Sequence, residues 1–220
     1  MIFLYLSITL ISYIIAKKMY KLYPHPFLTP VLTGTCFVLV VIYSLNLSMA
    51  DYAIVELIAG ELLGPATVAL AIPVYKHRSL IAAHVKEMAC GIFAGVSAAL
   101  FFSLISISLY NFTTGIATAL LVKTTTVPIA LELTAMQGGD VSLTVLTVMS
   151  TGVIGAVFGP KILSFFNIYH AVARGTAIGS IAHGIGTAHI VQEGELEGAS
   201  SAVAMAAAGV SLSILLGIMH

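Results

Sequence analysis

Lys123 stands beside three consecutive threonines in the stretch 122–132, VKTTTVPIALE, and Pro128 follows them. If a helix restarts near Pro128, its first N–H groups have no partner inside the helix, and its positive dipole end faces the threonine hydroxyls. Lys123 adds a full positive charge at the same place. This combination predicts a binding site for an anion such as a carboxylate. The residues of this predicted site are Lys123, Thr124, Thr125, Thr126 and Pro128.

A second polar stretch covers residues 173–198, ARGTAIGSIAHGIGTAHIVQEGELEG. Its glycines permit close packing or an unwound backbone. His189 and Glu193 are four residues apart and share a helical face. His183 and His189 are six apart and lie on different faces, so we expect no metal site here. For His183 the alternative is a core histidine satisfied by its neighbours. The candidate residues of this stretch are Arg174, His183, Gly186, Thr187, His189 and Glu193.

A third stretch, residues 56–73, contains Glu61 shortly before the pair Gly64 and Pro65. Proline removes a backbone donor and disturbs the helical ladder. We therefore expect a discontinuous helix at Gly64–Pro65, as in transporters, with a simple proline kink as the alternative. Glu61 is a candidate for proton coupling. The candidates for gating in this stretch are Gly64, Pro65 and Thr67.

The elements that position these residues must be membrane helices. The 220-residue chain is 59 % apolar and 8 % charged, against about 45–50 % and 25 % in soluble domains. Nine basic and nine acidic residues cancel, so no basic field attracts nucleic acid. This composition excludes soluble globular, disordered and nucleic-acid-binding proteins. The apolar runs are long and unbroken, which indicates an all-α polytopic membrane protein and not a barrel.

We expect seven to nine transmembrane helices. The segment 112–135 is interrupted by polar residues and is either one pass or two short passes. The first segment precedes its positive residues and is expected to be retained, not cleaved as a signal. Cys36 and Cys90 lie in apolar runs, so we expect no disulfide. The apolar segments are residues 2–16, 27–47, 52–75, 88–110, 112–135, 142–165, 171–191 and 199–219.

The basic residues bear on the number of passes, because cytoplasmic loops are enriched in lysine and arginine. With eight passes, the loops after the first and third segments share one side, which we take as cytoplasmic. Lys161 and Arg174 then fall on the other side. A ninth pass within 112–135 returns them to the cytoplasmic side, and both counts stay open. The basic residues of the two loops are Lys17, Lys18, Lys21, Lys76, Arg78 and Lys86.

Residues 63–69 resemble residues 183–189, at an offset close to half the chain. We interpret residues 1–220 as a single membrane domain with two related halves, approximately 1–110 and 111–220. Transporters are often built from such halves. An inverted repeat needs an odd number of passes in each half, hence nine passes or a re-entrant segment. The alternative is chance similarity between segments rich in small residues.

Simpler interpretations also exist for the polar residues. Lys123 can extend to a membrane surface, and the threonines can bond back to their own helix. Phosphate loops, nucleophile elbows and cysteine metal pairs are missing from the sequence. We therefore expect no enzyme, no cofactor and no metal, with a membrane hydrolase using Glu61 or Glu132 as its base as the alternative. Glycines four residues apart predict close helix packing: Gly60/Gly64, Gly91/Gly95, Gly155/Gly159 and Gly175/Gly179.

Three motifs together resemble the LrgB/CidB family. They are GPATVALAIPVYKHR at 64–78, KTTTVPIALE at 123–132 and ARGTAIGSIAHGIGTAHIVQEGELEGA at 173–199. They occur in order, and the resemblance covers nearly the whole chain. Members of the family are described as antiholin-like regulators of murein hydrolases, and relatives include the plastidial glycolate/glycerate translocator. The resemblance implies a transporter-like fold with crossed broken helices, similar to cation/proton antiporters and bile-acid symporters.

The resemblance also implies substrate contacts by the matching residues. Family members often have a basic residue where this chain has His189, which implies weaker and pH-dependent binding here. The matching residues are Lys123, Thr124, Thr125, Thr126, Pro128, Arg174, His183, Gly186 and Thr187.

We therefore expect a secondary transporter of small monocarboxylates, such as pyruvate or glycolate, in the bacterial plasma membrane. Protons are expected to couple through Glu61 or His183, and Glu132 and Glu193 are candidates for coupling or gating. The expected assembly is a homo-oligomer, a complex with an LrgA-type membrane partner, or both. The alternative function is a holin-like modulator of murein hydrolase activity and lysis.

Overall fold

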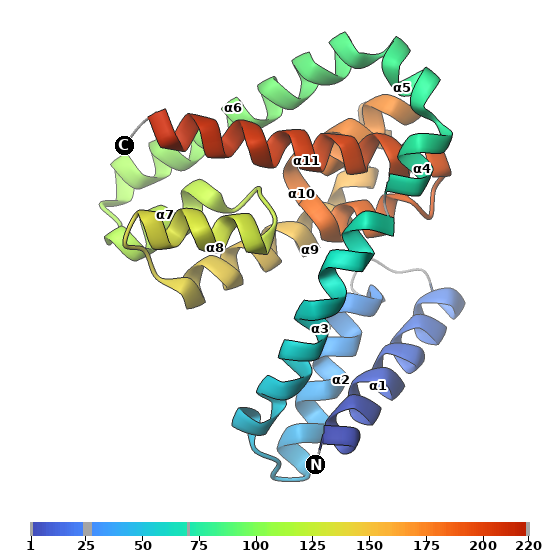
Figure 1. Cartoon of the computed structure of the whole chain (residues 1–220), viewed down its shortest axis with the longest axis vertical. Helices are drawn as coiled ribbons and strands as arrows, with labels where there is room; N and C mark the ends of the chain where they lie inside the picture. Colours follow the sequence, from blue (N-terminus) through green and yellow to red (C-terminus); the bar gives the residue numbers. More distant parts are fainter. Residues whose placement is uncertain (1, 24–27, 70, 219–220) are drawn as a thin grey trace. The chain divides into compact units, whose positions relative to one another are not determined.

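The computed structural model consists of helices throughout the residues that it describes (Figure 1). The chain forms two units, Met1–Ala69 and Leu70–His220. The predicted halves, 1–110 and 111–220, stay a prediction. The residues described are 2–23, 28–69 and 71–218, without the side chains of 56, 63, 64, 66 and 67. Residues 27 and 219, where two predicted segments begin and end, lie outside this description.

The N-terminal unit contains α1 (Ile2–Leu22), α2 (Pro30–Ser44) and α3 (Met49–Ala69). The buried Tyr5 holds its helices together: its hydroxyl donates to the Ser48 carbonyl at 2.9 Å, and its ring meets the Tyr52 ring edge-on at 6.0 Å between centroids.

The predicted break at Gly64–Pro65 is wrong, because α3 continues through Pro65 to Ala69. One proline removes one hydrogen bond of the ladder, and a helix can absorb that loss by bending. Glu61 and Pro65 are exposed on α3. Gly64 and Thr67 belong to α3, but their side chains lie outside the described part of the structure.

The C-terminal unit contains the remaining helices. They are α4 (Ala71–Lys76), α5 (Arg78–Ala83), α6 (Val85–Tyr110), α7 (Thr114–Val122), α8 (Val127–Met136), α9 (Val141–Phe165), α10 (Ala171–Ile190) and α11 (Glu195–Ile218).

Within the described residues, four helices are long and apolar enough to cross a membrane: α1, α6, α9 and α11. They have 21 to 26 residues, and at about 1.5 Å per residue they cover the hydrocarbon core of about 30 Å. The α2 helix has 15 residues and reaches only about 22 Å. The structure confirms an all-α membrane protein, whereas the total of seven to nine passes stays a prediction.

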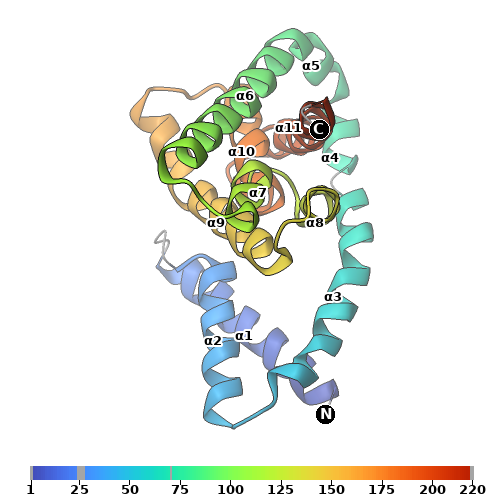
Figure 2. The same cartoon turned by 90° about the vertical axis from the view of Figure 1, so that its left-hand side faces the viewer.

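The expected segment 112–135 is a re-entrant hairpin of α7 and α8, which lie side by side in both views (Figures 1 and 2). The end of the hairpin packs back on its beginning, since a Cβ placed on Gly139 would lie 2.7 Å from Thr118 Cγ2. Its arms have 9 and 10 residues, about 14–15 Å, half the thickness of the hydrocarbon core. The turn between them therefore lies near mid-membrane, and Pro128 near the start of α8 confirms the predicted helix restart.

The α10 helix also doubles back on itself, at His183, where φ is 40° and ψ is −136°. A straight helix would separate residues 174 and 190 by about 24 Å, yet Arg174 Nη2 donates to Glu193 Oε2 at 2.8 Å. A Cβ on Gly186 would lie 2.8 Å from Cγ2 of Ile178, eight residues earlier. The structure thus has a second hairpin where the sequence predicted one pass at 171–191. The glycines of this stretch were expected to permit close packing or an unwound backbone, and the structure shows a non-helical residue at His183.

The two hairpins enter the unit from opposite ends. The α7–α8 hairpin lies between the end of α6 and the start of α9, whereas the α10 hairpin lies between the end of α9 and the start of α11. Because α9 runs from one end to the other, the turns of the hairpins point toward each other.

Basic residues gather at the end of the C-terminal unit where α6 begins. Lys76 forms an ion pair with Glu195, and the His84 and His170 rings are 5.3 Å apart, so α6, α10 and α11 all begin at this end. The loops at the opposite end, 111–113 and 138–140, contain no lysine or arginine. The positive-inside rule therefore predicts that the end where α6 begins faces the cytoplasm. Because α7 and α8 form a hairpin, Lys161 and Arg174 lie at this same end.

Glycines let the arms of the α10 hairpin approach the spanning helices. A Cβ on Gly155 of α9 would lie 2.5 Å from the Ala182 Cβ, and one on Gly95 of α6 would lie 3.2 Å from the Ser180 hydroxyl. The predicted close packing is confirmed at Gly91/Gly95, Gly155/Gly159 and Gly175/Gly179, where a placed Cβ would lie within 3.4 Å of a neighbour. It is wrong at Gly60, where nothing lies within 4 Å.

Replacing Gly155 by alanine is expected to destabilise the protein by about 1–3 kcal/mol, because the added methyl group overlaps Ala182 and the helices must separate. The measurement is the free energy of unfolding in mixed micelles during an SDS titration. Gly60→Ala is the control: nothing lies within 4 Å of a Cβ there, so alanine should stabilise the helix by about 0.5–1 kcal/mol. Equal effects of the two substitutions would contradict the packing described.

The base of the α10 hairpin depends on Arg174, whose side chain is 8 % exposed. Its guanidinium donates to Glu193, to Ser164 Oγ at 3.2 Å, and to the carbonyl oxygens of Ile168 and Pro160 at 2.9 and 3.3 Å. One side chain therefore ties together the end of α9 and both ends of α10.

Glu193→Gln is expected to lower the free energy of unfolding by about 1.5–3 kcal/mol, since it weakens a charged hydrogen bond to a buried arginine. The matched control is Glu195→Gln, two residues later. Glu195 pairs with Lys76, but both side chains are about 60 % exposed, so this loss should be clearly smaller than that of Glu193→Gln. The same SDS titration measures both variants. A larger loss of unfolding free energy for Glu195→Gln than for Glu193→Gln would contradict the role of the Arg174–Glu193 pair at the base of the hairpin.

Candidate functional site

The turns of the two hairpins both contact the middle of α11. A Cβ placed on Gly209 of α11 would lie 3.2 Å from Thr125 Oγ1, in the turn between α7 and α8. The sulfur of Met205, one helical turn earlier, lies 3.9 Å from a Cβ placed on Gly184, in the α10 turn. The two contacts are about 6 Å apart along the axis of α11. Because α11 runs from residue 195 to residue 218, Met205 and Gly209 lie near its centre, and both turns are therefore near mid-membrane.

Thr125 is the most unusual residue of the first turn. It is 1 % exposed, and its hydroxyl has no hydrogen-bond partner. The next residue, Thr126, directly precedes α8 and makes no side-chain capping bond to it. The first N–H groups of α8, at Val127 and Ile129, therefore have no acceptor within the helix. Several hydrogen-bond donors are thus left at one buried point. Thr124 is buried beside them, and Pro128 is exposed on the outer side of α8.

Lys123 brings a positive charge to the same turn. It is half-buried and its ammonium group donates to Ser103 Oγ of α6 at 2.5 Å. Ser103 Oγ in turn lies 2.8 Å from the carbonyl oxygens of Ala99 and Leu120. Within the described part of the chain, no carboxylate forms an ion pair with Lys123. An uncompensated lysine at mid-membrane costs about 2.5–3.5 kcal/mol on insertion scales, and a bound anion would offset this cost.

His183 forms the second turn and is 3 % exposed. Its Nε2 lies 3.1 Å from the Val148 carbonyl oxygen and must donate, because a carbonyl oxygen only accepts. The positive φ of His183 is a strained conformation that costs an L-residue about 1–3 kcal/mol and that glycine adopts freely. The ring fits because Gly152 of α9 faces it: a Cβ there would lie 2.6 Å from His183 Cε1.

The other predicted residues of the α10 stretch lie along the arms and at the base. Thr187 donates to the His183 carbonyl oxygen and pairs with Ser201 Oγ, both at 2.8 Å, and it fixes the second arm on α11. Gly186 packs against the first arm. Arg174 and Glu193 are at the base of the hairpin, and His189 is half-buried on the second arm. Of the predicted residues of this stretch, only His183 lies in the turn itself.

Glu132 lies outside the turn between α7 and α8, and the candidates of the stretch 56–73 belong to the other unit. Glu132 is exposed on α8, one helical turn beyond its first residues. Glu61 and Pro65 belong to the N-terminal unit. Among the described residues, no group of three or more His, Cys, Asp or Glu side chains is placed to hold a metal ion.

Sequence reasoning missed residues that support the turns. Ser103 holds Lys123, and a serine inside an apolar run was its only signal. Gly152 and Gly209 make room for the two turns. Glycines at these positions are two among 19 in the chain, so composition did not distinguish them. Val148 acts through its main-chain carbonyl group, which a side-chain pattern does not reveal.

A sequence model described as "LrgB-like family" matches residues 9–220. The chain belongs to the LrgB family. It is similar to the protein YxaC of Bacillus subtilis, with 33 % identity over 96 % of this chain and 89 % of the relative. It is also similar to YwbG of the same species, with 29 % identity over 93 % and 91 % of the two chains.

Another relative of this LrgB-family protein is the holin-like protein CidB of Staphylococcus aureus, with 26 % identity over 98 % of this chain and 94 % of CidB. No solved structure matches the chain. With four apolar helices of membrane-spanning length, these relatives identify a multi-pass bacterial membrane protein.

Proposed function

We propose that this LrgB-family protein is a secondary transporter of small monocarboxylates, with its binding site at the turn 123–126. The observation that carries this proposal is that an ammonium group without a carboxylate partner, a buried hydroxyl without a hydrogen-bond partner and a helix start without a side-chain cap occur in one turn. Lys123, the Thr125 hydroxyl and the first N–H groups of α8 all require an acceptor. A carboxylate accepts several such bonds at once and cancels the charge.

The site favours one carboxylate on a small molecule. Lys123 is the one lysine or arginine in the two turns, because Arg174 is held at the base by Glu193. A second carboxylate on the ligand would lack a cation. Thr125 and His183 are nearly inaccessible, so little space is left between the turns. Pyruvate and glycolate have the expected charge and size.

Opposed hairpins also provide a physical route for transport. Both turns reach the same depth from opposite ends, so displacing either turn exposes the site to one side of the membrane. A site near the midplane formed by discontinuous helices is typical of secondary transporters. We propose no enzymatic role. We expect the chain to work as a homo-oligomer or with an LrgA-type membrane partner, and adding this partner to vesicles would measure its contribution.

Uptake of labelled pyruvate and glycolate into vesicles that contain the purified chain tests this proposal. We expect saturable uptake that Lys123→Met reduces to background, and that Thr125→Val weakens about 10- to 100-fold through loss of a hydrogen bond to a charged ligand. Lys161→Met is the matched control, because Lys161 is exposed near the end of α9. Normal uptake by Lys123→Met would refute the site. Uptake with and without a pH gradient tests proton coupling, for which His183 is the candidate at the turns and Glu61 the one in the N-terminal unit.

The alternative is a holin-like modulator of murein hydrolase activity, which the name of the relative CidB favours. Such a protein would permeabilise the membrane through assembly, without need of Lys123. We expect vesicles with this chain to retain a trapped anionic dye under conditions in which they take up pyruvate. Dye release that persists in Lys123→Met would favour the holin-like function instead.

A further inference from the structure

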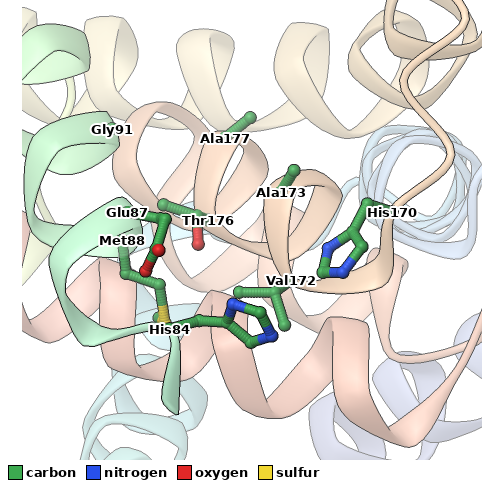
Figure 3. Close-up of a pocket in the computed structure, with 9 residues that line it drawn as sticks. All are labelled: His84, Glu87, Met88, Gly91, His170, Val172, Ala173, Thr176 and Ala177. Atoms are coloured by element: carbon green, nitrogen blue, oxygen red, sulfur yellow. The ribbon is translucent and has the colours of Figure 1, made fainter. Parts of the chain in front are cut away.

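A cavity of about 490 Å³ lies between the start of α6 and the first arm of α10, at the cytoplasmic end of the C-terminal unit (Figure 3). Gly91 faces Thr176 and Gly95 faces Ser180 across this seam. Residue numbers rise together on the two elements, so they run parallel and enter the membrane from the same end. The cavity is thus aligned with the bilayer, from its surface inward.

The polarity of the cavity changes with depth. His84, Glu87 and His170 line its outer part, at the first residues of the two helices. Deeper positions are apolar or small, with Met88 and Val172 almost fully buried. The distance from His170 to Ala177 along the arm is about 10 Å. A membrane lipid has the same sequence of chemistry, from charged headgroup to ester to hydrocarbon.

Thr176 is the exception among the deeper residues. It is 5 % exposed, and its hydroxyl has no hydrogen-bond partner. Several other helical hydroxyls bond back to the carbonyl group four residues earlier, as Thr147 does at 2.7 Å and Ser180 at 2.8 Å. The Thr176 hydroxyl is instead turned into the cavity, toward the space that Glu87 and His84 also line (Figure 3).

We propose that this cavity binds one phospholipid whose headgroup carries a primary ammonium group. The imidazole N–H groups of His84 and His170 donate to its phosphate, and the Glu87 carboxylate accepts from its ammonium group. The Thr176 hydroxyl donates to an ester carbonyl oxygen below the phosphate. A zwitterionic headgroup fits this lining because an anionic lipid would leave Glu87 facing a net negative charge.

This lipid site is independent of the proposed carboxylate site. Thr176 is seven residues from His183 on the α10 arm, about 10 Å along its axis. The contacts of Gly91 and Gly95 with the first arm of α10 fill the space between the cavity and the turn at His183. A lipid held here would bind the outer face of the hairpin to α6.

Native mass spectrometry of the delipidated full chain tests the proposal, with phosphatidylethanolamine, phosphatidylcholine and phosphatidylglycerol of identical acyl chains added separately. We expect one phosphatidylethanolamine molecule to be retained in preference to the others. Thr176→Val should weaken its retention about 3- to 10-fold, and Glu87→Gln should remove the preference over phosphatidylcholine. Thr147→Val makes the same chemical change at a hydroxyl bonded to its own helix, and it should leave retention unchanged.

A filling substitution covers the case in which Thr176→Val does not fold. Ala173 lines the cavity and is exposed, so Ala173→Leu should abolish lipid retention while pyruvate uptake persists. Retention by Ala173→Leu equal to that of the unaltered chain would overturn the proposal, as would equal retention of the three lipids. Loss of pyruvate uptake with unchanged lipid retention would also overturn it and would assign the cavity to the carboxylate path.

Discussion

A helix that ends inside a bilayer leaves N–H and C=O groups that lipid cannot satisfy, and the C-terminal unit is organised around this constraint. Both hairpins end helices at mid-depth. Ser103 lies within hydrogen-bond distance of the Leu120 carbonyl oxygen near the end of α7, and Thr187 donates to the carbonyl group of His183 at the second turn. The start of α8 has no comparable support. The donors left there explain why the polar chemistry of the unit concentrates at that turn.

The same constraint explains the small residues on α9, α10 and α11. The arms of a hairpin are too short to span the membrane, so their position depends on close contact with the spanning helices beside them. Gly155 contacts Ala182, and Gly179 of α10 packs directly on the main chain of Ser201 in α11. In a membrane, where apolar side chains gain nothing by leaving lipid, such contacts supply van der Waals packing between helices. The strained His183 backbone persists because contacts on both sides determine the conformation of the turn.

The sequence predicted some of these features and missed others for identifiable reasons. The turn at 123–126 was predictable because Pro128 and three threonines interrupt an apolar run, and both features have local effects on a helix. The reversal at His183 was not predicted beyond the possibility of an unwound backbone, since it depends on Gly152, which contacts His183 from a distant part of the sequence. The break expected at Pro65 failed because a single proline also fits a bent helix. Arg174 matched a motif, but its position at the base follows from Glu193, which the fold alone brings near.

The contacts of α10 also impose an order on how the protein is made. Residues 171–190 are not among the helices apolar enough to enter a membrane as a span. One arm rests on α9, which is synthesised earlier, and both arms rest on Ser201 of α11, which is synthesised later. The contacts that hold both arms of the hairpin can therefore form only after α11 has been synthesised.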